Sequence, residues 1–127
     1  MEQSILINFL KSFFKLFKAE IENYKVINKK IFGTIGWSNE IDKQDFVFTY
    51  DFGNSSLSKL KLLCDYLNTN NLIEGDKIIL TETDLIFTLI KAGWNENNAK
   101  DAINLLCSFD VKMLDDGEET DSFFIHF

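Results

Sequence analysis

The residues whose types and spacing could support binding or proton transfer are the carboxylates near the end of the sequence. Residues 110–127 contain six acids and a single lysine, a net charge of −5. Carboxylates at this density could bind hard cations, transfer protons or attract a basic partner. Their spacing lacks the D-x-D-x-D-G pattern that places oxygen atoms around calcium, so we predict a partner-binding surface and no metal site. The acids are Asp110, Asp115, Asp116, Glu118, Glu119 and Asp121.

The other reactive side chains form no recognisable catalytic or metal-binding motif. His126 is the only histidine, and we expect it at the surface or at a sheet edge. Cys64 and Cys107 lie far apart and outside any CxxC motif, so we predict two buried thiols of a reduced protein. No GxSxG, P-loop, GxGxxG or HExxH occurs. We therefore predict a protein that is not an enzyme and takes no cofactor; the alternative is a hydrolase whose acids converge only in the fold.

The sequence contains no arginine, since all thirteen basic residues are lysine. Arginine supplies the planar fork that recognises guanine and phosphate with two hydrogen bonds, whereas lysine is a point charge. We therefore predict no nucleic-acid partner.

Charge is divided unevenly along the chain. Residues 1–30 contain six lysines and three acids, a net charge of +3, and because the whole chain carries −7, residues 31–127 carry −10. An acidic surface of this kind keeps a protein in solution, and it also steers a basic partner and speeds association. We predict a basic protein partner for a chain that is itself a monomer or a weak dimer.

Residues 1–30 are expected to form a basic amphipathic helix. Apolar residues recur at helical spacing from residue 4 to about residue 24, and the lysines fall on the opposite face. One face would pack on the core; the alternative is an anionic membrane surface, to which basic, Phe-rich helices bind. The apolar residues are Leu6, Phe9, Leu10, Phe13, Leu16, Phe17, Ile21 and Tyr24.

Residues 31–52 change to the two-residue period of strands. We predict a strand over residues 31–37, a polar loop over 38–44, and a second strand over 46–52 with four aromatics on one face. These strands would form an antiparallel β-hairpin.

The pattern of residues 56–127 predicts a longer series of helices and strands. A helix runs to about residue 70 and a short strand covers residues 77–80; Thr81 and Asn95 then cap two helices separated by a turn at Gly93. A hairpin ends the series, with strands at 111–114 and 122–127 about a turn at 115–119. Ala99, Ala102, Ile103 and Leu106 would form the buried side of the second capped helix.

In the order of these elements, residues 56–127 resemble a winged-helix domain. The resemblance implies that the helix from Asn95 would enter the major groove of DNA and that the hairpin would contact phosphates. That helix and hairpin are acidic, which opposes contact with a phosphate backbone. Trp94 and Glu96 lie where the two helices meet, and we predict that they bind the partner together with the hairpin acids.

The 127 residues are expected to form one α+β domain. No run of apolar residues is long enough to span a membrane. Glu2 occupies the place of a cationic n-region and Lys11 interrupts the apolar stretch, so we expect no secretory signal and a cytoplasmic protein.

The whole chain resembles the immunity proteins of bacterial toxin systems such as contact-dependent growth inhibition. It shares with them a small size, an acidic charge and an abundance of Lys, Asn, Ile and Phe. The resemblance implies a tight one-to-one complex in which the acidic face covers the active or substrate surface of a basic toxin, often a nuclease. A winged-helix transcription regulator, or a domain that interacts with one, is the alternative.

Overall fold

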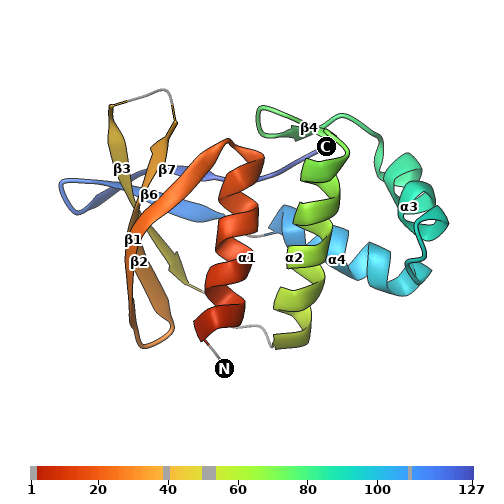
Figure 1. Ribbon diagram of the computed structural model, residues 1–127, viewed down its shortest axis with the longest axis horizontal. Coiled ribbons are helices and arrows are strands. Elements are labelled where there is room, and N and C mark those ends of the chain that lie inside the picture. The colour runs from red at the N-terminus through yellow and green to blue at the C-terminus, as the bar shows by residue number, and fades with distance from the viewer. Residues whose placement is uncertain (1–2, 39–40, 50–53, 109) are drawn as a thin grey trace.

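The fold combines an antiparallel sheet at one end of the molecule with a group of helices that extends to the other end, and of the described helices only the first packs broadly against the sheet (Figure 1). The computed structural model describes residues 3–38, 41–49, 54–108 and 110–127. Within them the helices are α1 (Gln3–Leu16), α2 (Asn54–Thr69), α3 (Glu82–Lys91) and α4 (Glu96–Ser108). The strands are β1 (Ala19–Ile27), β2 (Lys30–Trp37), β3 (Lys43–Thr49), β4 (Ile73–Glu74), β5 (Lys77–Ile78), β6 (Val111–Asp115) and β7 (Glu118–Phe123). The combination confirms the predicted α+β class.

Helix α1 is shorter than the sequence predicted. Its last turn tightens, with the amide of Phe17 donating to the carbonyl of Phe14, and Lys18 then takes a left-handed conformation (φ 61°) that ends the helix. The prediction of a helix as far as Tyr24 was therefore wrong, because residues 19–27 form β1. Ile21 and Tyr24 fit a helical period, but pairing with β2 decides the conformation of this segment. Over α1 itself the predicted apolar face is buried and Lys11 and Lys15 are exposed.

The main sheet joins the two ends of the sequence. Strands β2 and β3 pair antiparallel, as predicted, but the order β1-β2-β3-β6-β7 places the C-terminal hairpin beside β3. In that junction Phe46 pairs with Met113. Of the four aromatics predicted on one face, Phe46 and Phe48 are buried, and Tyr50 and Phe52 lie outside the described residues.

The core is built around α1, which lies between the sheet and α2 (Figure 1). The ring of Phe14 is 4.9 Å from that of Phe46, and the ring of Phe9 is 6.3 Å from that of Phe48. These aromatic contacts require a glycine in β2, because a Cβ on Gly33 would come within 2.8 Å of the Phe46 ring. The core is aromatic-rich, as its composition indicated.

The helices at the other end of the molecule follow the sequence closely. The hydroxyl of Thr81 accepts a hydrogen bond from the amide of Asp84 (3.2 Å), and the Asn95 side chain accepts one from the amide of Asn97 (2.9 Å). Gly93 has the positive φ (102°) of a glycine that ends a helix. The four residues predicted on the inner side of α4 are buried.

Strand pairing in residues 56–127 does not confirm the winged-helix arrangement. Strands β4 and β5 pair with each other, whereas the hairpin β6–β7 extends the main sheet at β3. The segment of β5 meets the end of the chain through a parallel bridge between Lys77 and His126. The hairpin turn is also tighter than predicted: it contains only Asp116 and Gly117, and β7 begins at Glu118. The predicted turn at 115–119 and strand at 122–127 are corrected accordingly.

Candidate protein-binding site

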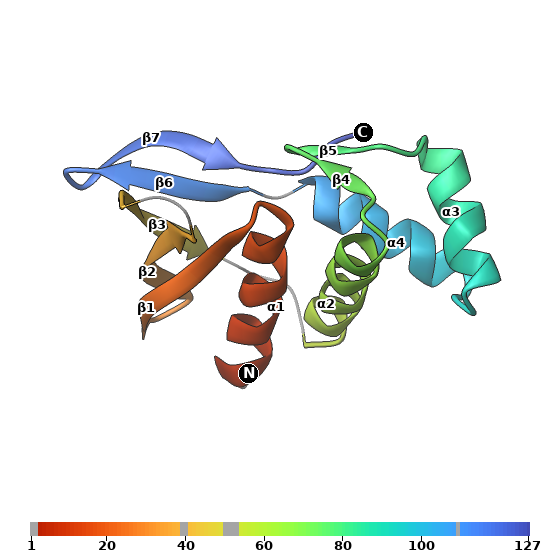
Figure 2. The same ribbon diagram turned by 45° about the horizontal axis from the view of Figure 1, so that its top comes forward.

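The residues predicted to bind a partner fall into two separate groups. The acids of residues 110–121 belong to the β6–β7 hairpin, whereas Trp94 and Glu96 belong to the junction of α3 and α4. Figures 1 and 2 show the hairpin turn and the α3–α4 junction at opposite ends of the molecule. The structure therefore does not bring Trp94 and Glu96 to the acidic surface.

The hairpin exposes its acids because it is tightly turned and because β7 is an edge strand. Asp116 and Gly117 both have positive φ (52° and 82°), as two-residue hairpin turns require. Thr120 is an additional residue in β7, since Met113 pairs with Asp121 and Leu114 pairs with Glu119. Asp115, Asp116, Glu118, Glu119 and Asp121 are all exposed.

Asp110 differs from the acids at the hairpin turn because it has a cation of its own. Its carboxylate lies 2.8 Å from the Lys112 ammonium group. The hydrogen bond from Lys112 holds the pKa of Asp110 below its ordinary value, against the opposing effect of partial burial. The same contact raises the pKa of Lys112. Within the described parts of the chain, the five acids from Asp115 to Asp121 form no ion pair, so their charge is available to a partner.

Two acids that the sequence analysis missed join this surface. Asp42, just before β3, and Asp45, within it, line the same open hollow as Asp115 and Asp116. This acidic hollow, defined by these four acids and Trp37, has a volume of about 560 Å³. Its lining includes one lysine, Lys43, whose ammonium group lies 2.6 Å from Glu22. No local spacing indicates the cluster, because the pairing of β3 with β6 creates it.

An aromatic pocket adjoins the acidic hollow. Phe17, Trp37 and Phe123 line it together with Leu16 and Ile73, and its volume is about 390 Å³. The rings of Phe17 and Phe123 are 4.8 Å apart, and those of Trp37 and Phe123 are 6.1 Å apart. Trp37 lines both the pocket and the acidic hollow. We refer to the two together as the Trp37 surface.

The second tryptophan has different surroundings. Trp94 lines a hollow of about 360 Å³ with Lys59, Leu62 and uncharged residues. Glu96 lies 3.3 Å from Lys100, one helical turn away, in an exposed ion pair. The hollow beside Trp94 therefore lacks the acidic character expected of the predicted site.

On the face of the sheet opposite the helices lies a hollow of about 400 Å³. Its lining contains one lysine, Lys25, and one acid, Asp45, beside Phe32 and Leu114. The opposite charges leave it without the net charge of the acidic hollow.

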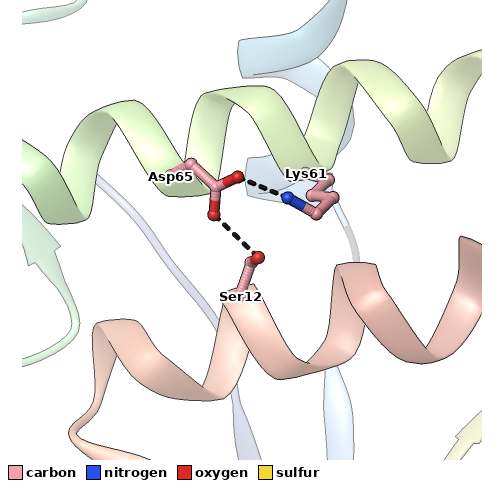
Figure 3. A network of polar contacts seen from close by, with 3 residues as sticks. All are labelled: Ser12, Lys61 and Asp65. Atoms are coloured by element: carbon pink, nitrogen blue, oxygen red, sulfur yellow. Dashed lines mark hydrogen bonds and ion pairs between the residues drawn. The ribbon is translucent and has the colours of Figure 1, made fainter.

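A polar network links α1 to α2, as Figure 3 shows. The Ser12 hydroxyl donates to one carboxylate oxygen of Asp65 (2.8 Å), and the Lys61 ammonium group contacts the other (2.6 Å). Each oxygen of Asp65 thus has a donor, and in this network the serine faces a carboxylate that is already paired with a cation. The arrangement holds the two helices together and does not resemble an activated nucleophile.

The remaining reactive groups are dispersed. His126 is exposed, and its Nε2 lies 3.3 Å from Asp76. Cys64 is buried, as predicted, and desolvation raises the pKa of its thiol. Cys107 is exposed, which corrects the prediction that both thiols are buried; its place at the end of α4 follows the inner-facing Leu106. Among residues with described positions, no group of three or more His, Cys, Asp or Glu side chains could hold a metal ion.

Comparisons with known proteins provide no further assignment. Of the helices that the structure describes, none has the length and apolar character needed to cross a membrane. No protein-family model matches the chain, and no significant match was found among curated proteins or solved structures.

Proposed function

We propose that the chain is a non-catalytic binding protein that uses its acidic hairpin and the adjacent acidic hollow to hold a basic partner protein. The partner class we favour is a cognate bacterial toxin, possibly a nuclease, whose active or substrate surface the acidic side chains cover in the cytoplasm. The observation that carries the proposal is the convergence of Asp42 and Asp45 with Asp115 and Asp116 in one hollow. Concentrated charge of one sign raises the association rate with an oppositely charged surface.

The location of the acids favours a protein over a nucleic acid. A hairpin that presents Glu118, Glu119 and Asp121 along an exposed edge repels phosphates. An edge strand with charged side chains also resists pairing with identical copies of itself, because like charges would be brought together. This supports a chain that works in complex with a different, basic protein.

The test uses the basic toxin domain that this proposal expects to be encoded beside the gene. We expect the full chain to bind it one to one, to protect cells from it, and to bind more weakly as salt rises. The double variant Asp115→Asn/Asp116→Asn should weaken binding about tenfold at low salt, because two charges are lost from the hollow. Asparagine tolerates the positive φ of residue 116, so the turn is retained.

The matched control removes two charges from the other end of the molecule. Glu96→Gln/Asp101→Asn makes the same change in net charge on α4, and we expect it to leave affinity within about twofold of the unchanged protein. Equal weakening by both double variants would show that only net charge matters. A chain that neither binds nor neutralises the toxin would contradict the proposal.

One observation favours a second function, that of a winged-helix regulator. In the described residues, the six lysines of α1, β1, the adjoining turns and the start of β2 form no ion pair: Lys11, Lys15, Lys18, Lys25, Lys29 and Lys30. Unpaired lysines could contact phosphates. Retardation of a DNA duplex at moderate salt, abolished by Lys11→Gln/Lys15→Gln, would support this alternative.

A further inference from the structure

Trp37 occupies the boundary between two chemically different depressions. On one side lies the acidic hollow with its four carboxylates, and on the other lies the aromatic pocket formed with Phe17 and Phe123. Lys18 and Glu74 both line the aromatic pocket, so its charge is balanced. Polar and apolar atoms are exposed in it in nearly equal measure, and its apolar side chains are those of Leu16, Phe17, Trp37, Ile73 and Phe123. A partner that fills both depressions must present an apolar group directly beside a cation.

The hydrogen bonding of Trp37 restricts what its ring offers to that partner. The indole Nε1–H donates to the carbonyl of Phe17 at 3.2 Å, so this donor is already used within the protein. The ring remains half-buried and lines both depressions. It therefore contributes apolar surface and, at the face of the ring, attraction for a cation, and not a hydrogen-bond donor.

We propose that the Trp37 surface recognises a basic segment of the partner in which an apolar side chain adjoins a lysine or arginine. The apolar side chain enters the aromatic pocket and contacts Phe17 and Phe123. The neighbouring cation enters the acidic hollow, where it meets Asp115 and Asp116. The inference rests on the proposed function, and it adds that binding needs an apolar anchor as well as charge.

Charge complementarity identifies this occupant among the alternatives. An acidic segment would be repelled by the hollow, and two copies of the chain joined hairpin to hairpin would bring like charges together. A purely basic segment would leave the aromatic pocket in contact with water, although buried aromatic anchors provide much of the affinity in protein interfaces. A segment with an apolar side chain beside a cation fills the aromatic pocket with the first and the acidic hollow with the second.

The experiment uses two capped peptides of equal charge, Lys-Phe-Lys-Phe-Lys and Lys-Ser-Lys-Ser-Lys. Each is titrated into the full chain labelled with ¹⁵N, and the indole resonances of Trp37 and Trp94 are followed. We expect the Phe peptide to shift the Trp37 resonance saturably and to bind about tenfold more tightly than the Ser peptide. The Trp94 resonance serves as the internal control and should not move.

Two variants separate the contributions of the two depressions. Phe123→Leu, which keeps an apolar side chain in the fold, should remove most of the tenfold preference while leaving the Ser peptide unaffected. Asp115→Asn/Asp116→Asn should weaken both peptides by the same factor. Equal binding of the two peptides, no saturable shift at Trp37, or a shift centred on Trp94 would each overturn the inference.

The outcomes also distinguish this inference from the proposed function. If the two peptides bind equally while the acidic hollow is still needed for binding the toxin, only the apolar anchor is wrong. If the peptides behave as expected but the neighbouring toxin is neither bound nor neutralised, the Trp37 surface does recognise an apolar side chain beside a cation. The proposed role as a toxin inhibitor is then wrong.

Discussion

The two tryptophans lie in hollows of opposite character. Trp37 lines a hollow together with four carboxylates and lies 6.1 Å from the ring of Phe123, whereas Trp94 lines a hollow with Lys59 and Leu62. Trp94 stands next to Glu96 in the sequence, yet its hollow contains no acid. Trp37 is distant in sequence from the hairpin, yet it shares a hollow with Asp115 and Asp116. Proximity along the chain was thus a poor guide to the neighbours of an aromatic anchor.

The two ends also differ in the side chains that form their part of the core, aromatic at the Trp37 end and aliphatic, such as Leu85, Leu89 and Ile103, at the Trp94 end. Buried aromatic packing supports the Trp37 end, where Phe14 contacts both Phe46 and Phe123. At the Trp94 end, a pair of capped helices is joined by a glycine turn, and α3 has an exposed Phe87. We expect mutations to affect stability according to this difference.

The largest effect is expected from truncation of a core ring. Phe14→Ala removes a fully buried side chain and should lower the free energy of unfolding by about 3–5 kcal/mol, because a cavity replaces contacts with Phe13, Phe46 and Phe123. Phe87→Ala is the matched change at the other end; its side chain is 61% exposed, and we expect a change within about 0.5 kcal/mol. Urea denaturation measures both. Similar losses in the two variants would contradict the contrast between the ends.

A smaller effect is expected from loss of a helix cap. Thr81→Ala removes the acceptor for the amide of Asp84 and should cost about 1 kcal/mol. Amide hydrogen exchange should accelerate first in α3, because the cap stabilises that helix directly. Thr83→Ala, two residues later on an exposed position of the same helix, introduces a better helix former and should not destabilise it. Uniformly faster exchange across the sheet as well would show that the two ends are not energetically distinct.

The smallest effect concerns one carboxyl at the base of the hairpin. Lys112→Met removes the hydrogen bond that lowers the pKa of Asp110, so this pKa should rise toward its ordinary value of 3.8. Because the pKa is lower in the folded protein, the interaction stabilises the fold above pH 3.8 and is lost as the pH falls through the folded value. An NMR titration of the Asp110 carboxyl measures the change. Lys100→Met, which removes a lysine at the opposite end, should leave this titration unchanged.

The parts of the fold that sequence could predict are those set by neighbouring residues. Thr81, Gly93 and Asn95 mark the ends of α3 and α4 because capping and positive φ depend on a few adjacent positions. The buried side of α4 likewise followed from helical spacing. The exposed acids of the hairpin were identified because charge is visible in the sequence itself.

The parts that could not be predicted depend on distant partners. The segment of β1 has apolar residues at spacings that suit a helix, and only its pairing with β2 settles its conformation. The acidic hollow depends on the pairing of Asp45 with Leu114, and no pattern in a single sequence indicates that contact. This is why the sequence placed Trp94, and not Trp37, in the predicted binding site, and why Asp42 and Asp45 were not predicted there.

The pairing of β3 with β6 also determines when the main sheet can finish folding during synthesis. During synthesis β3 emerges well before β6, so its edge, with Val47 and Phe46, stays unpaired until the last strands arrive. Contacts between distant segments close slowly, and an open strand edge invites aggregation in the meantime. The same late event assembles the acidic hollow. A chain that has not finished folding therefore has no complete acidic hollow, and a partner that binds there would select mature molecules.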